Sequence, residues 1–243
     1  MFRVLEICTA NIASAVAAQM AGATRIELCS ELAAGGVTPS VGVIEQVRSR
    51  IDIAINVLIR PRSGDFLYSS DEVESVLRDI AWCSKLGVQG VVVGALTPDA
   101  KVDVDASRQW LKEARSRGLS ATFHRAIDCA ENIFDATEVI ASMGYDRILT
   151  SGGFPTAYEG IENIAKMVQM TSGKGPIIMP GSGVNPDNIR EIITRTKAEE
   201  IHFSASSVYP SGMKVLGGVA KEETLTQSDP LKIKAAIQTL MSL

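Results

Sequence analysis

Two four-residue segments near the start of the chain share one order of residue types: apolar, acidic, apolar, thiol. The first is Leu5-Glu6-Ile7-Cys8 and the second is Ile26-Glu27-Leu28-Cys29. Because side chains alternate between the two faces of a β-strand, the acid and the thiol of each segment share one face. A carboxylate and a thiol are unusual choices for a strand that only builds a core. The repeat therefore marks a candidate site.

Other polar residues with chemical potential follow later strand-like runs. Arg60 and Arg62 come after the third run, His124 and Asp128 follow the fifth, and His202 lies in the eighth. Glycine and serine gather at the ends of the last three runs, at Gly152, Gly181, Ser182, Gly183 and Ser204. Backbone N–H groups of such turns, with a helix N-terminus behind them, are typical of anion sites.

The elements that must position these residues alternate between strand and helix. The predicted strands are 3–8, 24–29, 53–59, 88–94, 119–125, 146–151, 176–180 and 200–204. Capping residues predict helix starts at Asn11, Thr38-Pro39, Ser69 with Glu72, Asp103, Asn185-Pro186 and Asp229-Pro230. Alternating strands and helices require a parallel sheet, whose carboxyl ends share one edge.

The number of units favours a closed barrel. Eight strand–helix units in 243 residues fit a (β/α)₈ (TIM) barrel, and the first strand lacks the glycine-rich turn of a dinucleotide-binding open sheet. We expect one domain over residues 1–243, with a long irregular loop at about 205–228 between the last strand and the last helix. The unusual residues would then meet at the mouth of the barrel.

Composition excludes several classes of function. A net charge of −4 gives no electrostatic basis for binding nucleic acid or an anionic membrane. No apolar run approaches the ~20 residues of a membrane span. Four cysteines without disulfide-like spacing indicate reduced thiols and a cytoplasmic location.

The residues alone leave two interpretations of Cys8 and Cys29 open. Soft thiolates select Cu(I), two such ligands can suffice, and neighbouring strands lie close enough for one ion to bridge them. Cysteine also packs as a small buried hydrophobe, and we expect that role for Cys83 and Cys129.

The acids and arginines support a second hypothesis. A buried Glu6 or Glu27 must be paired or protonated, and Arg60, Arg25 or Arg62 could pair with it in a structural ion-pair layer. Alternatively, a desolvated glutamate acts as general acid or base with His124, whose imidazole Asp128 would orient. The chain would then be an enzyme that moves a proton on a small phosphorylated or carboxylated metabolite, held by Arg60, Arg62 and the glycine-rich turns.

Several motifs together resemble the CutC family. They include the two acid–thiol segments, Ile59-Arg60-Pro61-Arg62-Ser63-Gly64-Asp65-Phe66, Thr122-Phe123-His124-Arg125-Ala126-Ile127-Asp128 and Met179-Pro180-Gly181-Ser182-Gly183-Val184-Asn185. The resemblance runs in unbroken order to about Ser206. It implies a TIM barrel, a cytoplasmic copper-homeostasis protein, a homo-oligomer (dimer or tetramer), and Cu(I) ligands at Cys8 and Cys29. Whether the protein is also an enzyme stays open.

Overall fold

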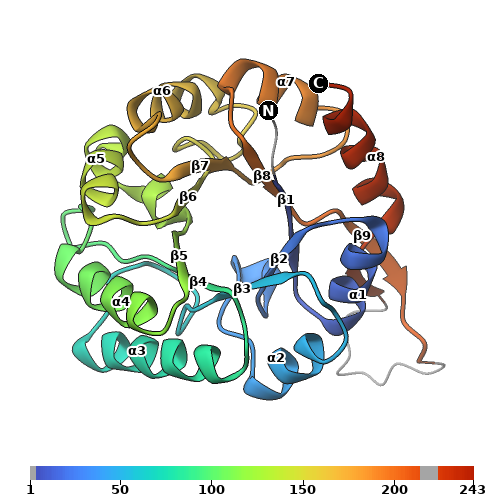
Figure 1. Cartoon of the computed structure of the whole chain (residues 1–243), viewed down its shortest axis with the longest axis horizontal. Coiled ribbons are helices and arrows are strands. Elements are labelled where there is room, and N and C mark those ends of the chain that lie inside the picture. The colour runs from blue at the N-terminus through green and yellow to red at the C-terminus, as the bar shows by residue number, and fades with distance from the viewer. Residues whose placement is uncertain (1–3, 214–223) are drawn as a thin grey trace.

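A parallel β-barrel forms the centre of the computed structural model, which describes residues 4–213 and 224–243. Its strands follow one another in the order β7-β6-β5-β4-β3-β2-β1-β8, and β7 and β8 meet at the remaining seam (Figure 1). The bounds are β1 Val4–Thr9, β2 Arg25–Leu28, β3 Ala54–Leu58, β4 Gly90–Val93, β5 Ser120–Phe123, β6 Arg147–Thr150, β7 Ile177–Pro180 and β8 Glu200–Phe203. The predicted (β/α)₈ barrel is confirmed.

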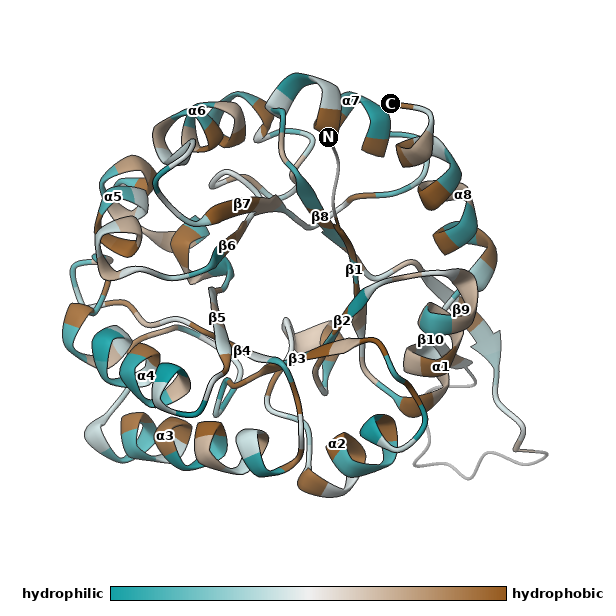
Figure 2. Ribbon diagram, in the orientation of Figure 1, coloured by the Kyte–Doolittle hydropathy of each residue, from teal (hydrophilic) through white to brown (hydrophobic). Residues whose placement is uncertain are grey.

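In the described part of the chain, eight α-helices surround the barrel (Figure 1). They are α1 Ile12–Ala21, α2 Val41–Arg48, α3 Ser70–Lys85, α4 Val104–Ser116, α5 Ile133–Met143, α6 Ile161–Thr171, α7 Ile189–Thr196 and α8 Pro230–Met241, and two short 3₁₀ turns are Leu32–Ala34 and Arg125–Cys129. Brown apolar and teal polar residues alternate along the helices in Figure 2. Among the described residues, no helix has both the length and the apolar character that crossing a bilayer requires.

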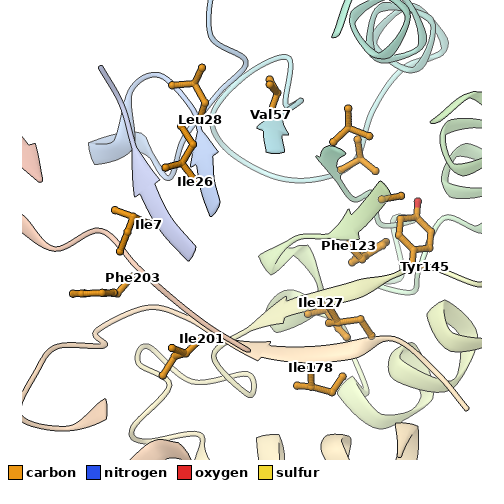
Figure 3. Close-up of a cluster of buried hydrophobic side chains, with 14 of the residues drawn as sticks. Ile7, Ile26, Leu28, Val57, Phe123, Ile127, Tyr145, Ile178, Ile201 and Phe203 are labelled. Carbon is orange, nitrogen blue, oxygen red and sulfur yellow. The ribbon is translucent and has the colours of Figure 1, made fainter. Parts of the chain in front are cut away.

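The alternation of the strands separates two environments. Ile7, Ile26 and Ile201 belong to the large apolar core between strands and helices, part of which Figure 3 shows. The side chains that alternate with them along the strands point to the opposite face. Among these, Cys8 and Cys29 pack with Leu58 and Val92 in a separate small cluster. The acid and the thiol of each repeated segment therefore face the barrel interior, as the sequence predicts.

Helix caps explain most of the helix starts, with two corrections. The Ser69–Glu72 capping box is present, and Asp103 and Asp229 accept backbone N–H groups at the starts of α4 and α8. The prediction for Pro39 is wrong, because Ser40 caps α2. Asn185 instead forms a turn by accepting the N–H groups of residues 187 and 188, and α7 begins only after it.

The segment 205–228, predicted to be irregular, contains regular structure. Strands β9 Ser206–Pro210 and β10 Thr224–Ser228 form an antiparallel ribbon beside α1, and residues 214–223 between them lie outside the described part. Asn11 Nδ2 donates to the Thr226 carbonyl, and the Ser228 N–H donates to Ser14 Oγ. The prediction missed the strands because a two-stranded ribbon lacks the apolar run of a buried strand.

Gly90 in β4 gives a prediction about packing inside the barrel. A Cβ there would lie 2.2 Å from Ser120 Oγ and 2.4 Å from Asn56 Oδ1, so these side chains of both neighbouring strands would have to move. We expect Gly90→Ala to lower the free energy of unfolding by about 1–3 kcal/mol, the usual range for an overpacked interior. Urea denaturation of the purified protein measures it.

Gly42 in α2 is the matched control. A Cβ there meets nothing within 4 Å, and alanine is favoured over glycine in a helix. Gly42→Ala is therefore expected to raise the free energy of unfolding by about 0.5 kcal/mol. Equal effects of the two substitutions would contradict the packing argument.

Candidate functional site

The floor of the barrel interior is a buried network of charges. Arg25 lies between the carboxylates of Glu6 and Glu200, and Arg147 Nε contacts Glu200 Oε2 at 2.8 Å. Asn56 Nδ2 donates to Glu6 Oε2 at 3.0 Å. The structural ion-pair layer is present, although Arg25 and Arg147 rather than Arg60 supply its cations.

Glu6 is committed to this network. Its Oε1 lies 2.9 Å from His202 Nδ1, and Oε2 contacts Arg25 and Asn56. Burial alone would raise the pKa of Glu6, but Arg25 and His202 outweigh it and lower that pKa to about 2. Both oxygens are engaged and the group is ionised, so Glu6 fits a structural role better than proton exchange.

The two thiols of the repeat lie side by side above this floor. Cys8 Sγ is 3.8 Å from Cys29 Sγ and 3.7 Å from Glu27 Oε1, and both thiols are buried. Cys29 also contacts the Thr9 carbonyl at 3.6 Å. The hydrogen bond with Cys29, burial and nearby carboxylates together raise the pKa of Cys8 well above its usual range. Cys8 is therefore a thiol at neutral pH, and a bound metal ion would have to displace its proton.

Glu27 and His202 complete this group. The ligand atoms of Cys8, Glu27 and His202 all lie within 4.8 Å of one another, and Glu27 Oε2 has no hydrogen-bond partner in the described residues. Burial raises the pKa of Glu27 to about 7 although His202 opposes the shift. Burial would lower the pKa of His202, but Glu6 and Glu27 outweigh it and raise that pKa.

A cavity of about 500 Å³ opens above this group at the carboxyl ends of the strands. Such a volume suits a small ligand. The predicted residues that line it are Cys8, Glu27, Cys29, Arg60, His124, Asp128, Ser182, Gly183, His202 and Ser204. The barrel thus brings together most of the candidates that lie far apart in the sequence.

Arg60 is a buried cation held by backbone. Its guanidinium donates to the carbonyls of Ala34, Gly36 and Gly64, and Cζ lies 4.8 Å from the centre of the Phe66 ring. In residues 4–213 and 224–243 no carboxylate forms an ion pair with it, so the expectation that Arg60 pairs with Glu6 or Glu27 is wrong. Its positive charge lies beside the cavity without an ion-pair partner in that part of the chain.

His124 is neutral and presents one free nitrogen. Its Nδ1 accepts the Ala126 N–H at 3.2 Å, and burial beside Arg60 lowers the pKa of His124 to about 3. The proton therefore sits on Nε2, which is buried and has no partner in the described structure. Asp128 does not orient this imidazole, contrary to expectation, because its carboxylate accepts from Arg125, Thr150 and Ser151.

Besides Glu6, three candidates lie outside the cavity lining. Arg62 pairs with Glu72 at 2.6 Å and Asp65 at 2.9 Å on the surface. A Cβ on Gly152 would meet the Gly160 carbonyl, and one on Gly181 would meet Leu149, both at 2.6 Å. Close packing thus explains both glycines.

The sequence interpretation missed Arg147 and Glu200, the outer members of the floor network. A signal was available: Glu200-Ile201-His202 repeats the polar–apolar alternation of the acid–thiol segments. The strand register pairs Glu6 with both Arg25 and His202. Pairing of the first and last strands therefore unites residues from opposite ends of the chain.

Glu27 allows a prediction about pH and stability. Its folded pKa of about 7 lies above the ordinary value of 4.5, so folding binds a proton between these values. The free energy of unfolding therefore falls by about 3 kcal/mol as the pH rises from 4.5 to about 7. We expect Glu27→Gln to be more stable than the wild type at pH 8 and similar to it at pH 4.5. Urea midpoints at the two pH values measure this, and an equal difference at both would contradict the assignment.

These features define a class of protein: a (β/α)₈ barrel whose rim cavity holds two thiols, a carboxylate and an imidazole. The CutC family model matches residues 3–207. The chain belongs to the CutC family.

Relatives and solved structures agree with this assignment. A "family protein CutC" of Glaesserella parasuis is 41% identical over 239 residues, covering 96% of this chain and 97% of that protein. The human "copper homeostasis protein cutC homolog" is 41% identical over 210 residues, covering 86% of this chain and 76% of that protein. A crystal structure of the putative copper homeostasis protein CutC from Streptococcus agalactiae has a TM-score of 0.78 and 30% identity, covering 84% and 99%.

A more distant structure extends only the fold comparison. Phosphoribosylanthranilate isomerase from Thermotoga maritima has a TM-score of 0.58 and covers both chains fully, at 13% identity. At that identity it supports the barrel architecture and nothing further.

Proposed function

We propose that this protein binds Cu(I) between Cys8 and Cys29 as a copper-homeostasis protein. The observation that carries the proposal is the 3.8 Å separation of the two sulfurs. Metal–thiolate bonds of about 2.3 Å allow one ion to bridge sulfurs up to ~4.6 Å apart. Soft thiolates favour Cu(I) over harder ions. The copper-homeostasis names of the human and streptococcal relatives support the same function.

His202 and Glu27 suit the surroundings of such an ion. Glu6 holds His202 through Nδ1, which leaves Nε2 as the nitrogen available for a ligand. A metal-binding histidine fixed by a carboxylate in this way is a common arrangement. Glu27 Oε1 lies 3.7 Å from Cys8 Sγ, so its carboxylate would offset charge on an ion bound to that sulfur.

A competition titration tests the copper proposal. Under reducing conditions, the protein should withdraw one equivalent of Cu(I) from a colorimetric Cu(I) chelator. X-ray absorption at the copper edge should then show two sulfur neighbours. A spectrum with only nitrogen and oxygen neighbours would contradict binding by the two thiols.

We further propose that the protein is cytoplasmic and forms a homo-oligomer. Cu(I) binding requires reduced thiols, and Cys8 and Cys29 are free, which fits the cytoplasm. The CutC resemblance also implies a homo-oligomer, dimer or tetramer. Sedimentation equilibrium of the full chain tests the assembly, with a purely monomeric protein contradicting it.

A second candidate function rests on the unpartnered Oε2 of Glu27. This buried oxygen belongs to a residue that lines the cavity, with His124 and Arg60 in the same lining. Its pKa near 7 suits a general acid or base. We propose that Glu27 exchanges a proton with a small anionic metabolite there. In the step, the Glu27 carboxylate takes the proton from a carbon next to a carbonyl, and the electron pair of the broken carbon–hydrogen bond forms a carbon–carbon double bond. The π pair of the carbonyl moves onto its oxygen, which accepts a hydrogen bond from His124.

Deuterium uptake tests the enzyme candidate. Small phosphorylated and carboxylated hydroxy-carbonyl compounds are incubated with the protein in D₂O and followed by mass spectrometry. The wild type should add one deuterium to a compound that is turned over, and Glu27→Gln should not. Equal uptake with both proteins would contradict the role of Glu27.

A further inference from the structure

Backbone N–H groups at the ends of β7 and β8 lack acceptors. Within the described residues, the N–H groups of Ser182, Gly183 and Val184 donate no hydrogen bond, and neither do those of Ser204 and Ala205. Four of these five residues line the cavity. Because the two turns follow neighbouring strands, their free donors lie at one side of the barrel mouth (Figure 1).

The same turns are held in place through their other polar atoms. The Ser182 carbonyl accepts from the Ala157 N–H at 3.0 Å, and Ser182 Oγ donates to the Pro155 carbonyl at 2.8 Å. The Gly183 carbonyl accepts from Asn188 Nδ2 at 2.9 Å, and that of Ser204 accepts from Ser228 Oγ at 2.9 Å. The carbonyl oxygens of Ser182, Gly183 and Ser204 thus accept hydrogen bonds, while the N–H groups of these residues remain free. The two turns therefore present positive partial charge.

Two buried side-chain atoms of the cavity lining also lack a hydrogen-bond partner in the described residues. His124 Nε2 and Glu27 Oε2 are buried polar atoms without a hydrogen bond in the described structure, and the two residues are 5% and 4% exposed. Leaving such atoms unpaired is costly, so a polar ligand that reaches them would be stabilised. Arg60 places positive charge on the same lining, whereas the charge of Arg125 is paired with Asp128.

We propose that the cavity binds a small phosphate monoester, with its phosphate at the N–H groups of residues 182–184 and 204–205. This names the substrate class for the second proposed function and rests on it. Three terminal phosphate oxygens can accept from donors of both turns, whereas a carboxylate offers two. Turns after the seventh and eighth strands hold phosphate in many (β/α)₈ barrels. The carbon skeleton would then occupy the rest of the cavity, which Glu27 and His124 also line.

Amide NMR of the full chain tests the phosphate site. Glycerol 3-phosphate and glycerol form a matched pair that differs only in the phosphate. We expect glycerol 3-phosphate to shift the amide signals of residues 182–184 and 204–205 and inorganic phosphate to compete with it. Glycerol should leave these signals unchanged. Unshifted signals, or equal shifts with glycerol, would overturn the proposal.

A charge variant provides the control. Ser204→Asp places a carboxylate beside the free N–H groups and should weaken binding of glycerol 3-phosphate at least tenfold. Ser204→Asn, which is similar in size and neutral, should change it less than threefold, and equal effects would count against the site. Phosphate binding without deuterium uptake would contradict the proton-transfer function and support the phosphate site. Deuterium uptake on carboxylated compounds without phosphate binding would contradict the phosphate site and leave the proton-transfer function standing.

Discussion

Replacing Arg25 with methionine is expected to lower the free energy of unfolding by about 3–5 kcal/mol. The substitution would remove the cation that lies between the buried carboxylates of Glu6 and Glu200, and would leave only His202 beside the first and Arg147 beside the second. An uncompensated buried charge costs far more than the net contribution of the pair itself. Methionine keeps much of the side-chain volume, so the loss reports mainly on charge.

Urea denaturation at neutral pH measures this effect, and Arg78→Met is its control. Arg78 pairs with Glu74 at 3.0 Å on the surface of α3, where we expect a change below about 1 kcal/mol. The folded pKa of Glu6 is about 2, below its ordinary 4.5, so its contribution is present above pH 4.5 and is lost as pH falls toward 2. The difference between wild type and Arg25→Met should narrow in acid. A loss below about 1 kcal/mol at neutral pH would contradict the structural role of the network.

Replacing both Cys8 and Cys29 with serine is expected to weaken Cu(I) binding by at least about 100-fold. Two soft sulfur ligands would become hydroxyls, which bind Cu(I) poorly. Each single substitution should leave one sulfur ligand and give an intermediate loss. The chelator competition titration measures all three variants, and circular dichroism checks that each one is folded.

Cys129→Ser is the matched control for the thiol pair. Cys129 also lines the cavity, but it is exposed and stands apart from the Cys8–Cys29 contact. We expect its replacement to change Cu(I) affinity less than about threefold. Undiminished affinity in the double variant, or a loss as large in Cys129→Ser, would contradict the assignment of the ligands.

Local patterns predicted the elements of the fold well. Alternating apolar runs placed the eight barrel strands to within a few residues, and side-chain caps such as Asn11 and Asp103 marked helix starts. Pro39 was misleading because Ser40, one residue later, supplies the capping oxygen. The β9–β10 ribbon was missed because its partly exposed strands carry little apolar signal. Its strands are defined by pairing with each other, which local sequence does not reveal.

The sequence by itself determined which residues share a face and which end of a strand they occupy. Those properties follow from the two-residue period of a strand and the common direction of parallel strands. Only the tertiary structure decided the partners of each charge. Strand register places Arg25 between two acids and leaves Glu27 without a direct ion pair in the described residues, so two glutamates in matching segments acquire opposite pKa shifts. Electrostatic energy depends on distances across the barrel and on burial, and neither is encoded in the spacing of residues along the chain.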